Sequence, residues 1–531
     1  MDGVASKAAN FQTLGVDSHA SEGRLKDAPS SLVKQGAVAF LWGTGGGVAR
    51  IVLQLGAQIA LARVLGPEAF GLFALGVVVV GFAAYFADFG LAYGLIQKQD
   101  LRDDEIRFVW TWQCALGLAV ALVLWTCSRQ FAALFAKPEA QPVFAWLSLV
   151  CLFNAMAAPS TNLLKKALDH KTLQLGQLAS YVAGYVCVGI PMALAGHGVA
   201  SLVTAMVIHA AVNLLIVYAR VRHSVAFRFR VAGGSRMLGY GAIVLATNLV
   251  NWILTSADRV IAGRVLPAQT FGLYTTAFNV VNSPASAAHA TLQSVVFASC
   301  ARLQEDPAAL KKTFLRLLAT VCVVAFPLFA VLAVGASVAM SALYGESFAP
   351  AEPYLRIFAF AMPCLMLWGI STPILWNSGR TRLEFQLQIP MVVVWCGTLA
   401  LVASQSGTVI AFATAVLLTA RAWIMAGVAA RLLAVTLHEF FAALRGGALL
   451  TLGMTAAAAV LLPVIQTSGA NFQVQLLLLL VACGVLYLVA LVALGPLLLE
   501  RGLASFVAAH VAQLPPPGAS LLRLATRHGE A

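Results

Sequence analysis

Residues 61–73 read LARVLGPEAFGLF, and residues 262–274 read AGRVLPAQTFGLY. The first string therefore reappears 201 residues later, with Arg63 matched by Arg264 and Gly71 matched by Gly272. Each copy lies where one apolar segment ends and the next begins, so we interpret the pair as the same helix junction in two halves of the chain. An even number of apolar segments separates the copies, which predicts two halves with the same orientation in a membrane.

The composition identifies the class of protein. The chain has 531 residues, of which 60% are hydrophobic and 10% charged, and its mean hydropathy is +0.86. Soluble domains carry about 25% charged residues, and a chain with so few cannot cover its core with polar surface. Runs of roughly twenty apolar residues recur from Gln35 to Leu499, and each can cross a bilayer as a helix. The composition predicts a polytopic membrane protein and excludes a soluble enzyme, a secreted disulfide scaffold and a disordered linker.

The apolar runs predict an all-α fold with about 14 transmembrane helices joined by short loops. Together with the repeat, they predict two pseudo-symmetric six-helix lobes followed by two further C-terminal helices. The predicted parts are an N-terminal tail (1–34), an N-lobe (35–220), a C-lobe (238–433), two extra spans (446–499) and a C-terminal tail (500–531).

The charged residues predict the orientation of these spans. The net charge is +13, with 34 Lys and Arg against 21 Asp and Glu, and most of the basic residues fall on one side of the predicted spans. Since cytoplasmic loops are enriched in Lys and Arg, we expect both termini in the cytoplasm. The net positive charge is thereby explained by the orientation of the chain in a lipid bilayer, and no nucleic-acid partner is expected.

Three stretches carry a resemblance to a known family: LARVLGPEAFGLFALG (61–76), ADFGLAYGLIQKQDL (87–101) and ADRVIAGRVLPAQTFGLYTTAFNVV (257–281). They resemble the Wzx-type polysaccharide exporters, which are lipid-linked oligosaccharide flippases of the multidrug/oligosaccharidyl-lipid/polysaccharide (MOP) superfamily. The resemblance covers about residues 35–500. It implies a cavity between two lobes that opens alternately to each side, a polyprenyl-linked sugar as substrate, and a polysaccharide polymerase and a chain-length regulator as partners.

Arg50 is a candidate for the wall of such a cavity, because it lies near the middle of the first predicted span. Gln54 and Gln58 follow at spacings of four, which places all three side chains on one helix face. An arginine at the bilayer centre costs about 2.5–3.5 kcal/mol, so it should face protein or water. We predict a hydrated, cationic wall, with a buried ion pair to Asp88 as the alternative; Arg421, deep in the twelfth span, is assigned the same cavity role.

Polar residues also form a stripe on the seventh and eighth predicted spans. The seventh carries Asn251 and Asp258, and the eighth carries Asn279, Asn282 and His289. Because polar groups lack partners in lipid, such stripes face a hydrated path or bond to other helices. We favour the cavity for the eighth span and leave both interpretations open for the seventh.

Asp88 is the carboxylate that the sequence places inside the second span, about nine residues from its cytoplasmic end. Intramembrane acids often bind a proton or a cation that drives transport. Asp88 and Asp258 are therefore candidates for a coupling group or for the partner of a buried arginine, and the sequence leaves both possibilities open.

Taken together, these features predict translocation of a polyprenyl-diphosphate-linked oligosaccharide across the bacterial inner membrane for exopolysaccharide, capsule or O-antigen (lipopolysaccharide) biosynthesis. We expect no catalytic residue, no metal ion and no cofactor. A peptidoglycan-precursor flippase and a cation-coupled drug exporter of the same superfamily are the alternatives. A membrane polymerase or ligase is disfavoured, because the predicted outer loops are too short to carry a catalytic site.

Overall fold

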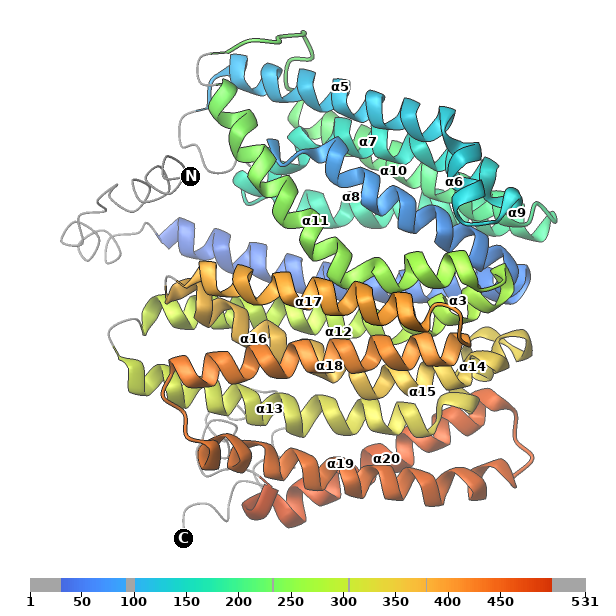
Figure 1. Cartoon of the computed structure of the whole chain (residues 1–531), viewed down its shortest axis with the longest axis vertical. Coiled ribbons are helices and arrows are strands. Elements are labelled where there is room, and N and C mark those ends of the chain that lie inside the picture. The colour runs from blue at the N-terminus through green and yellow to red at the C-terminus, as the bar shows by residue number, and fades with distance from the viewer. Residues whose placement is uncertain (1–29, 92–100, 232–233, 304–305, 379, 499–531) are drawn as a thin grey trace.

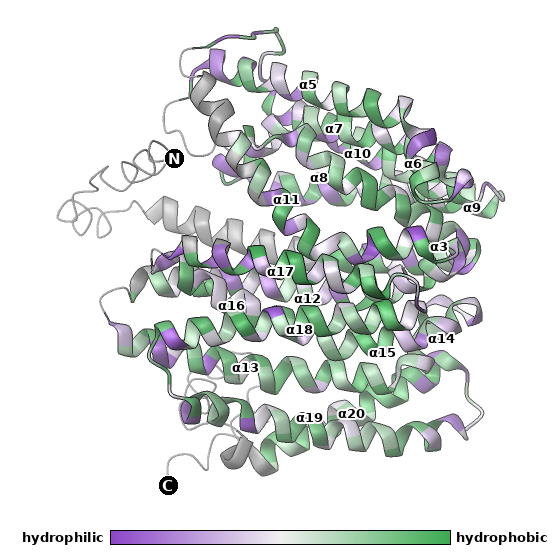
Figure 2. Cartoon of the chain, in the orientation of Figure 1, coloured by the Kyte–Doolittle hydropathy of each residue, from purple (hydrophilic) through white to green (hydrophobic). Residues whose placement is uncertain are grey.

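The computed structural model describes residues 30–91, 101–231, 234–303, 306–378 and 380–498, and these residues are almost entirely helical (Figure 1). The predicted C-terminal tail (500–531) and nearly all of the predicted N-terminal tail (1–34) lie outside the described residues. Figure 2 shows that the long helices are mainly hydrophobic along their length, with hydrophilic residues gathered toward their ends. This pattern is typical of helices that cross a bilayer.

The first half of the chain forms one bundle of helices, drawn at the top of Figure 1. Its elements are α3 (Ser30–Asp88), α5 (Asp103–Thr126), α6 (Ser128–Leu134), α7 (Gln141–Lys166), α8 (His170–Tyr181), a π-helical segment η3 (Val182–Gly189), α9 (Ile190–Leu194) and α10 (Val199–Val221), with a short 3-10 turn, η2 (Pro138–Ala140), before α7.

The second half begins with α11, which runs from beside α5 at the top of Figure 1 down to the lower bundle, and it ends with a helical pair. Its elements are α11 (Gly234–Val265), α12 (Ala268–Arg302), α13 (Pro307–Val334), α14 (Ala336–Tyr344), a 3-10 turn η4 (Glu346–Ala351), α15 (Glu352–Ala361), α16 (Pro363–Asn377), α17 (Thr381–Val402) and α18 (Gly407–Leu432), and the added pair is α19 (Leu437–Gln466) and α20 (Phe472–Leu498).

The predicted all-α membrane fold is confirmed, whereas the count of fourteen spans stays a prediction. Among the described residues, ten helical segments are long and apolar enough to cross a membrane. The helices α11 and α12, of 32 and 35 residues, are not among these ten. These are the two helices on which the sequence predicts polar stripes.

The helix α3 contains a sharp bend at the junction that the sequence predicts. Gly66 has φ 74° and ψ 175°, outside the helical region, and Pro67 restarts the helix after it. A positive φ is available to glycine at little cost, and proline is well suited to a first helical position. The predicted first and second spans are therefore the two arms of α3.

The helix α3 ends before the predicted end of the second span, which lies outside the described residues. Instead of continuing for about nine residues beyond Asp88, α3 ends at Asp88 itself. Phe89 and Gly90 have φ 45° and 66°, and the Phe89 amide donates to the Tyr85 carbonyl over 2.9 Å. Such left-handed residues terminate helices, so Asp88 is the last residue of α3, and it lies beside Gln113 near the middle of α5.

The two halves cross at the repeated junction. A methyl group on Gly71 would overlap the carbonyl oxygen of Ala268, and a methyl group on Gly272 would overlap the carbonyl oxygen of Pro67. The two contacts correspond to each other residue by residue in the repeat. Glycine is thus required at both positions, because α3 and α12 approach backbone to backbone there.

The repeated arginines join the halves on either side of this crossing. Arg63 Nε donates to the Leu343 carbonyl over 2.9 Å, and its Nη2 donates to Ala342, both in the last turn of α14. Arg264 Nη1 donates to the carbonyl of Leu134, the last residue of α6. Each arginine thus caps a helix C-terminus in the opposite half, where the carbonyls are unpaired and the helix dipole is negative. We call these two capping contacts and the two glycine contacts the clasp.

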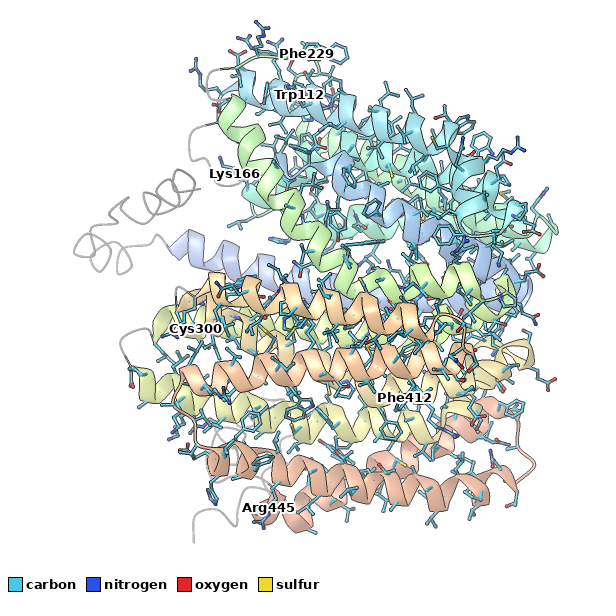
Figure 3. All side chains as sticks on the ribbon, in the orientation of Figure 1. Trp112, Lys166, Phe229, Cys300, Phe412 and Arg445 are labelled. Atoms are coloured by element: carbon cyan, nitrogen blue, oxygen red, sulfur yellow. The ribbon has the colours of Figure 1, made fainter. Side chains whose placement is uncertain are left out.

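A strap formed by residues 222–231 connects α10 to α11 and is bound to the first half. Arg228 Nη1 lies 2.8 Å from Asp104 Oδ1 of α5, and Trp112 Nε1 donates to the Phe229 carbonyl over 3.4 Å. Figure 3 shows Phe229 beside Trp112 at one end of the bundle. The connection between the halves therefore follows the first half, while the crossing near Gly71 joins the halves directly.

The crossing gives a first prediction. Gly272→Ala should lower the free energy of unfolding by about 1–3 kcal/mol, as overpacking typically does, because the added methyl meets backbone that cannot move away easily. Thermal unfolding of the purified protein measures this change. The matched control is Gly453→Ala on α19, where no atom lies within 4 Å of the added carbon. Equal melting temperatures for the two variants would contradict the crossing.

Candidate functional site

A cavity of about 510 Å³ lies between the two halves. Its wall comes from α3, α8, η3 and α10 of the first half and from α11 and α12 of the second. The lining residues are Ile51, Gln54, Leu55, Gln58, Leu61, Phe70, Phe73, Ala74, Val77, Val78, Gly81, Tyr181, Tyr185, Leu202, Met206, Trp252, Ser256, Arg259, Thr275, Thr276, Asn279 and Ser283. We call it the central cavity.

The central cavity combines amide and hydroxyl groups with aromatic rings. Gln54, Gln58 and Asn279, which the sequence predicts as cavity residues, contribute the amides. Tyr181 and Tyr185 stack with ring centroids 4.4 Å apart, and the π-helical segment η3 begins between them. Such segments are frequent at functional sites, because they redirect side chains that a regular helix would place elsewhere. Apolar faces beside hydrogen-bonding groups suit a ligand that has both, as sugars do.

Arg259 is the charged residue of the central cavity, and the sequence analysis did not select it. Its guanidinium donates to the Thr255 carbonyl and, over 3.0 Å, to Ser256 Oγ, and its carbon Cζ lies 4.4 Å from the centre of the Phe278 ring. Its Nε is 3.9 Å from Asp258 Oδ1. These contacts to its own helix and the ion pair with Asp258 hold the Arg259 guanidinium at the cavity wall.

A second cavity of about 290 Å³ lies within the second half, and we call it the C-half cavity. Four residues that the sequence predicts for the site line it: Asn282, His289, Asp258 and Arg421. Arg259 lines this cavity as well as the central one. The structure thus divides the predicted residues between two cavities and adds one arginine that belongs to both.

The carboxylate and imidazole of the C-half cavity are held by short hydrogen bonds. Tyr274 donates its hydroxyl to Asp258 Oδ2 over 2.8 Å, and His289 Nδ1 lies 2.9 Å from the Leu365 carbonyl. Because a carbonyl can only accept, the proton of His289 is on Nδ1. Asp258 is 1% exposed, so its charge is fixed on the second half by Tyr274.

Arg50, Asn251 and Asp88 do not appear in the lining of either cavity. Arg50 lies within electrostatic range of His209 of α10, and Asp88 accepts a hydrogen bond of 3.3 Å from Gln113 of α5. In the described part of the chain, no ion pair joins Arg50 to Asp88. Asn251 forms an interaction of its own within the protein. Transport roles for these three residues stay predictions.

Residues 60–353 match the family described as "Polysaccharide biosynthesis protein". The chain belongs to this family. The match spans more than half of the chain and includes both copies of the repeat, the clasp and the cavity-lining parts of α11 and α12. The predicted resemblance to polysaccharide exporters is thereby confirmed at the level of the family.

Relatives in bacteria agree with this assignment. The chain is 23% identical over 358 residues to the lipopolysaccharide biosynthesis protein WzxC of Escherichia coli (strain K12), covering 66% of this chain and 71% of that protein. It is 24% identical over 340 residues to the succinoglycan biosynthesis transport protein ExoT of Rhizobium meliloti (strain 1021), covering 64% and 69%. Together with its many membrane helices, this similarity supports a multi-pass inner-membrane protein.

Two solved structures show the same fold. The lipid II flippase MurJ in its inward closed conformation has a TM-score of 0.63 at 11% identity and covers 83% of this chain and 97% of that one. An inward-facing MATE multidrug transporter of the MOP superfamily has a TM-score of 0.56 at 12% identity, covering 72% and 94%. The chain has the fold of transporters of that superfamily.

The buried bond between Tyr274 and Asp258 gives a second prediction. Tyr274→Phe should lower the free energy of unfolding by about 1–3 kcal/mol, because it leaves a buried carboxylate without its hydroxyl donor. Chemical unfolding of the purified protein measures the change. Tyr218→Phe is the control, since that hydroxyl makes only a 3.5 Å contact with the His223 carbonyl. A smaller effect at Tyr274 than at Tyr218 would contradict the assigned bond.

Proposed function

We propose that this protein moves a polyprenyl-diphosphate-linked oligosaccharide across the bacterial inner membrane by alternating access. The observation that carries the proposal is the central cavity, which has walls from both halves, an arginine, three amides and stacked aromatic rings. A sugar-diphosphate head group presents hydroxyls, apolar ring faces and negative charge, and each finds a counterpart there. The polyprenyl tail would remain in the surrounding lipid.

The clasp supports the alternating part of the mechanism. It closes one end of the interface between the halves through contacts that are few and local: two backbone approaches and two arginines on helix C-termini. Hydrogen bonds of a charged donor to carbonyls are strong enough to hold a state and can still be exchanged for water. Opening this end requires that the clasp breaks while the opposite end closes.

Arg259 is the residue that we assign to the diphosphate. A guanidinium presents donors that match phosphate oxygens, and Arg259 is held by Thr255 and Ser256 at the wall of both cavities. Since it lines both cavities, a negatively charged group bound there would lie at the junction between them.

The proposal also covers the partner proteins and the orientation of the chain in the membrane. The exported repeat units would be joined by a polysaccharide polymerase under a chain-length regulator, and both termini would lie in the cytoplasm, as the distribution of basic residues predicts. A role in transport fits the relatives, one of which is named as a transport protein, better than a catalytic role.

The third prediction tests this function. In a host strain that lacks the gene, lipid-linked repeat units should accumulate, and the wild-type gene should restore polymer export. Arg259→Gln should reduce export at least tenfold, because a charged hydrogen bond contributes about 1.5–3 kcal/mol. The control is Arg356→Gln, which removes an exposed arginine that pairs with Glu352 outside both cavities.

Two outcomes would contradict the proposal at different levels. Normal export by Arg259→Gln at matched protein amount would remove the role of Arg259 but leave the transport function. Normal polymer and no accumulated lipid-linked units in the deletion strain would remove the transport function itself.

A further inference from the structure

The strap (222–231) carries two exposed aromatic side chains, each followed by an arginine. Phe227 is 70% exposed and Phe229 is 59% exposed, and Arg228 and Arg230 are exposed as well. Aromatic and basic residues thus alternate over four positions in a segment without regular secondary structure. Exposed apolar surface that polar residues surround marks a contact with a protein or a membrane. The position of the strap distinguishes between these two partners.

The strap crosses α5 at one residue of that helix. The amide of Arg228 donates to Thr111 Oγ1 over 2.8 Å, and the Thr111 hydroxyl in turn donates to the Arg107 carbonyl over 2.7 Å. A pair of aromatic rings lies on each side of this crossing, with centroids 5.5 and 6.4 Å apart: Phe227 with Trp110, and Phe229 with Trp112. These contacts fix the strap on α5.

The crossed face of α5 points away from the other helices of the first half. Val109 and Gln113 are both fully buried, and Gln113 donates to the carbonyl of Asp88 on α3 over 2.7 Å. Thr111 is two residues from each of them, which is about 200° around the helix. In Figure 1, α5 forms the edge of the first half. Since α5 is long and apolar enough to cross a membrane, the strap lies between this helix and the surrounding lipid.

The height of the crossing along α5 matches a membrane boundary. Arg107 is the last charged residue of α5, and the mainly apolar run that follows it (108–127) has the length of the hydrocarbon core. Thr111 lies about 6 Å beyond Arg107 along the helix. Irregular backbone does not occur in the lipid-exposed hydrocarbon, because its amides and carbonyls would lack partners there. The strap therefore lies in the layer of lipid head groups.

The charge of this region is positive. The strap contains three arginines and no acidic residue, and with the start of α5 (102–107) five arginines stand against three carboxylates. Asp104 is already engaged, since its Oδ1 lies 2.8 Å from Arg228 Nη1. No ion pair or hydrogen bond holds the side chain of Arg230 within the part of the chain that the structure describes. Arg230 thus keeps its charge and its donors for a partner outside the protein.

We propose that the strap is a binding site for anionic phospholipid at the membrane boundary. Phe227 and Phe229 extend the two tryptophans beneath them into the upper acyl chains, as aromatic residues do at membrane interfaces. Arg230 binds the lipid phosphates, since a long basic side chain can reach from an apolar surface to the head groups. Basic segments beside a membrane helix attract anionic lipids in this way.

This binding depends on the membrane fold and not on the proposed transport function. Because the strap connects α10 to α11, bound lipid would attach the connection between the two halves to one surface of the membrane. The phospholipid is recognised by its charge and its position, so both can be measured without the transported substrate.

The site is tested on the full-length protein in nanodiscs that contain equal amounts of phosphatidylcholine and phosphatidylglycerol. One variant carries the photoreactive residue p-benzoylphenylalanine in place of Phe227, and another carries it in place of Leu122, which is exposed on the apolar part of α5. Mass spectrometry after illumination reports the lipid bound at each position. We expect lipid adducts at both positions; adducts at Leu122 without adducts at Phe227 would overturn the proposal.

The ratio of phosphatidylglycerol to phosphatidylcholine adducts measures the preference for anionic lipid. We expect a higher ratio at position 227 than at position 122, and added salt should lower it, because salt screens exposed charges. Combining the probe at 227 with Arg230→Gln should reduce the ratio about fivefold, since a basic residue near an anionic surface contributes about 1 kcal/mol. Arg230→Lys should retain the ratio, because this attraction depends on charge.

The matched control is Arg431→Gln, which removes an exposed arginine in the last turn of α18 and should leave the ratio at position 227 unchanged. Equal ratios at positions 227 and 122, or a ratio at 227 that Arg230→Gln does not lower, would overturn the anionic preference. Cross-links from position 227 to a protein instead of lipid in host membranes would assign the strap to a protein partner and would also overturn the proposal.

Amide hydrogen exchange of the wild type gives a test that needs no variant. The strap peptide (222–231) should exchange more slowly in nanodiscs that contain phosphatidylglycerol than in nanodiscs of phosphatidylcholine alone, because bound head groups protect its backbone. Equal exchange in the two lipids would count against the site.

Discussion

The backbone crossing at Gly71 and Gly272 is the contact on which the arrangement of the halves depends. Neither glycine can carry a side chain, because each faces a carbonyl oxygen of the opposite half, at Ala268 and Pro67. Such an approach brings α3 and α12 together at one end, and Arg63 and Arg264 then reach the ends of α14 and α6. The repeated sequence thus forms an interface with pseudo-twofold symmetry between the halves.

This interface also explains where the cavities lie. With the halves joined at the crossing, the polar stripes of α11 and α12 face the first half on one side and the interior of the second half on the other. Asn279 consequently lines the central cavity, while Asn282 and His289 line the C-half cavity. One helix, α12, serves two spaces because two of its faces, one with Asn279 and the other with Asn282 and His289, point to different neighbours.

The sequence predicts the helices and the junctions well, since apolar length and the Gly66–Pro67 pair are local signals. Of the eight amide, imidazole and charged residues that line the two cavities, the sequence analysis selects seven, because such a residue in an apolar helix needs a partner whatever its neighbours are. It does not predict that α3 ends at Asp88, because the left-handed turn at Phe89 carries no strong local signal. It misses Arg259, because a basic residue near the end of a predicted span is usually explained by the orientation of the protein in the membrane. Only the packing of α11 against both halves places Arg259 at the two cavities.

The central claim is that the clasp and the opposite end of the interface open in alternation. It is tested most directly by spin-label distance measurements on two pairs, Glu68 with Glu346 beside the clasp and Leu168 with Arg431 near the helix ends opposite it, all exposed positions. Adding a membrane extract that contains the host's lipid-linked repeat units should lengthen the first distance and shorten the second in the same population. Two distances that stay fixed, or that lengthen together, would contradict alternating access.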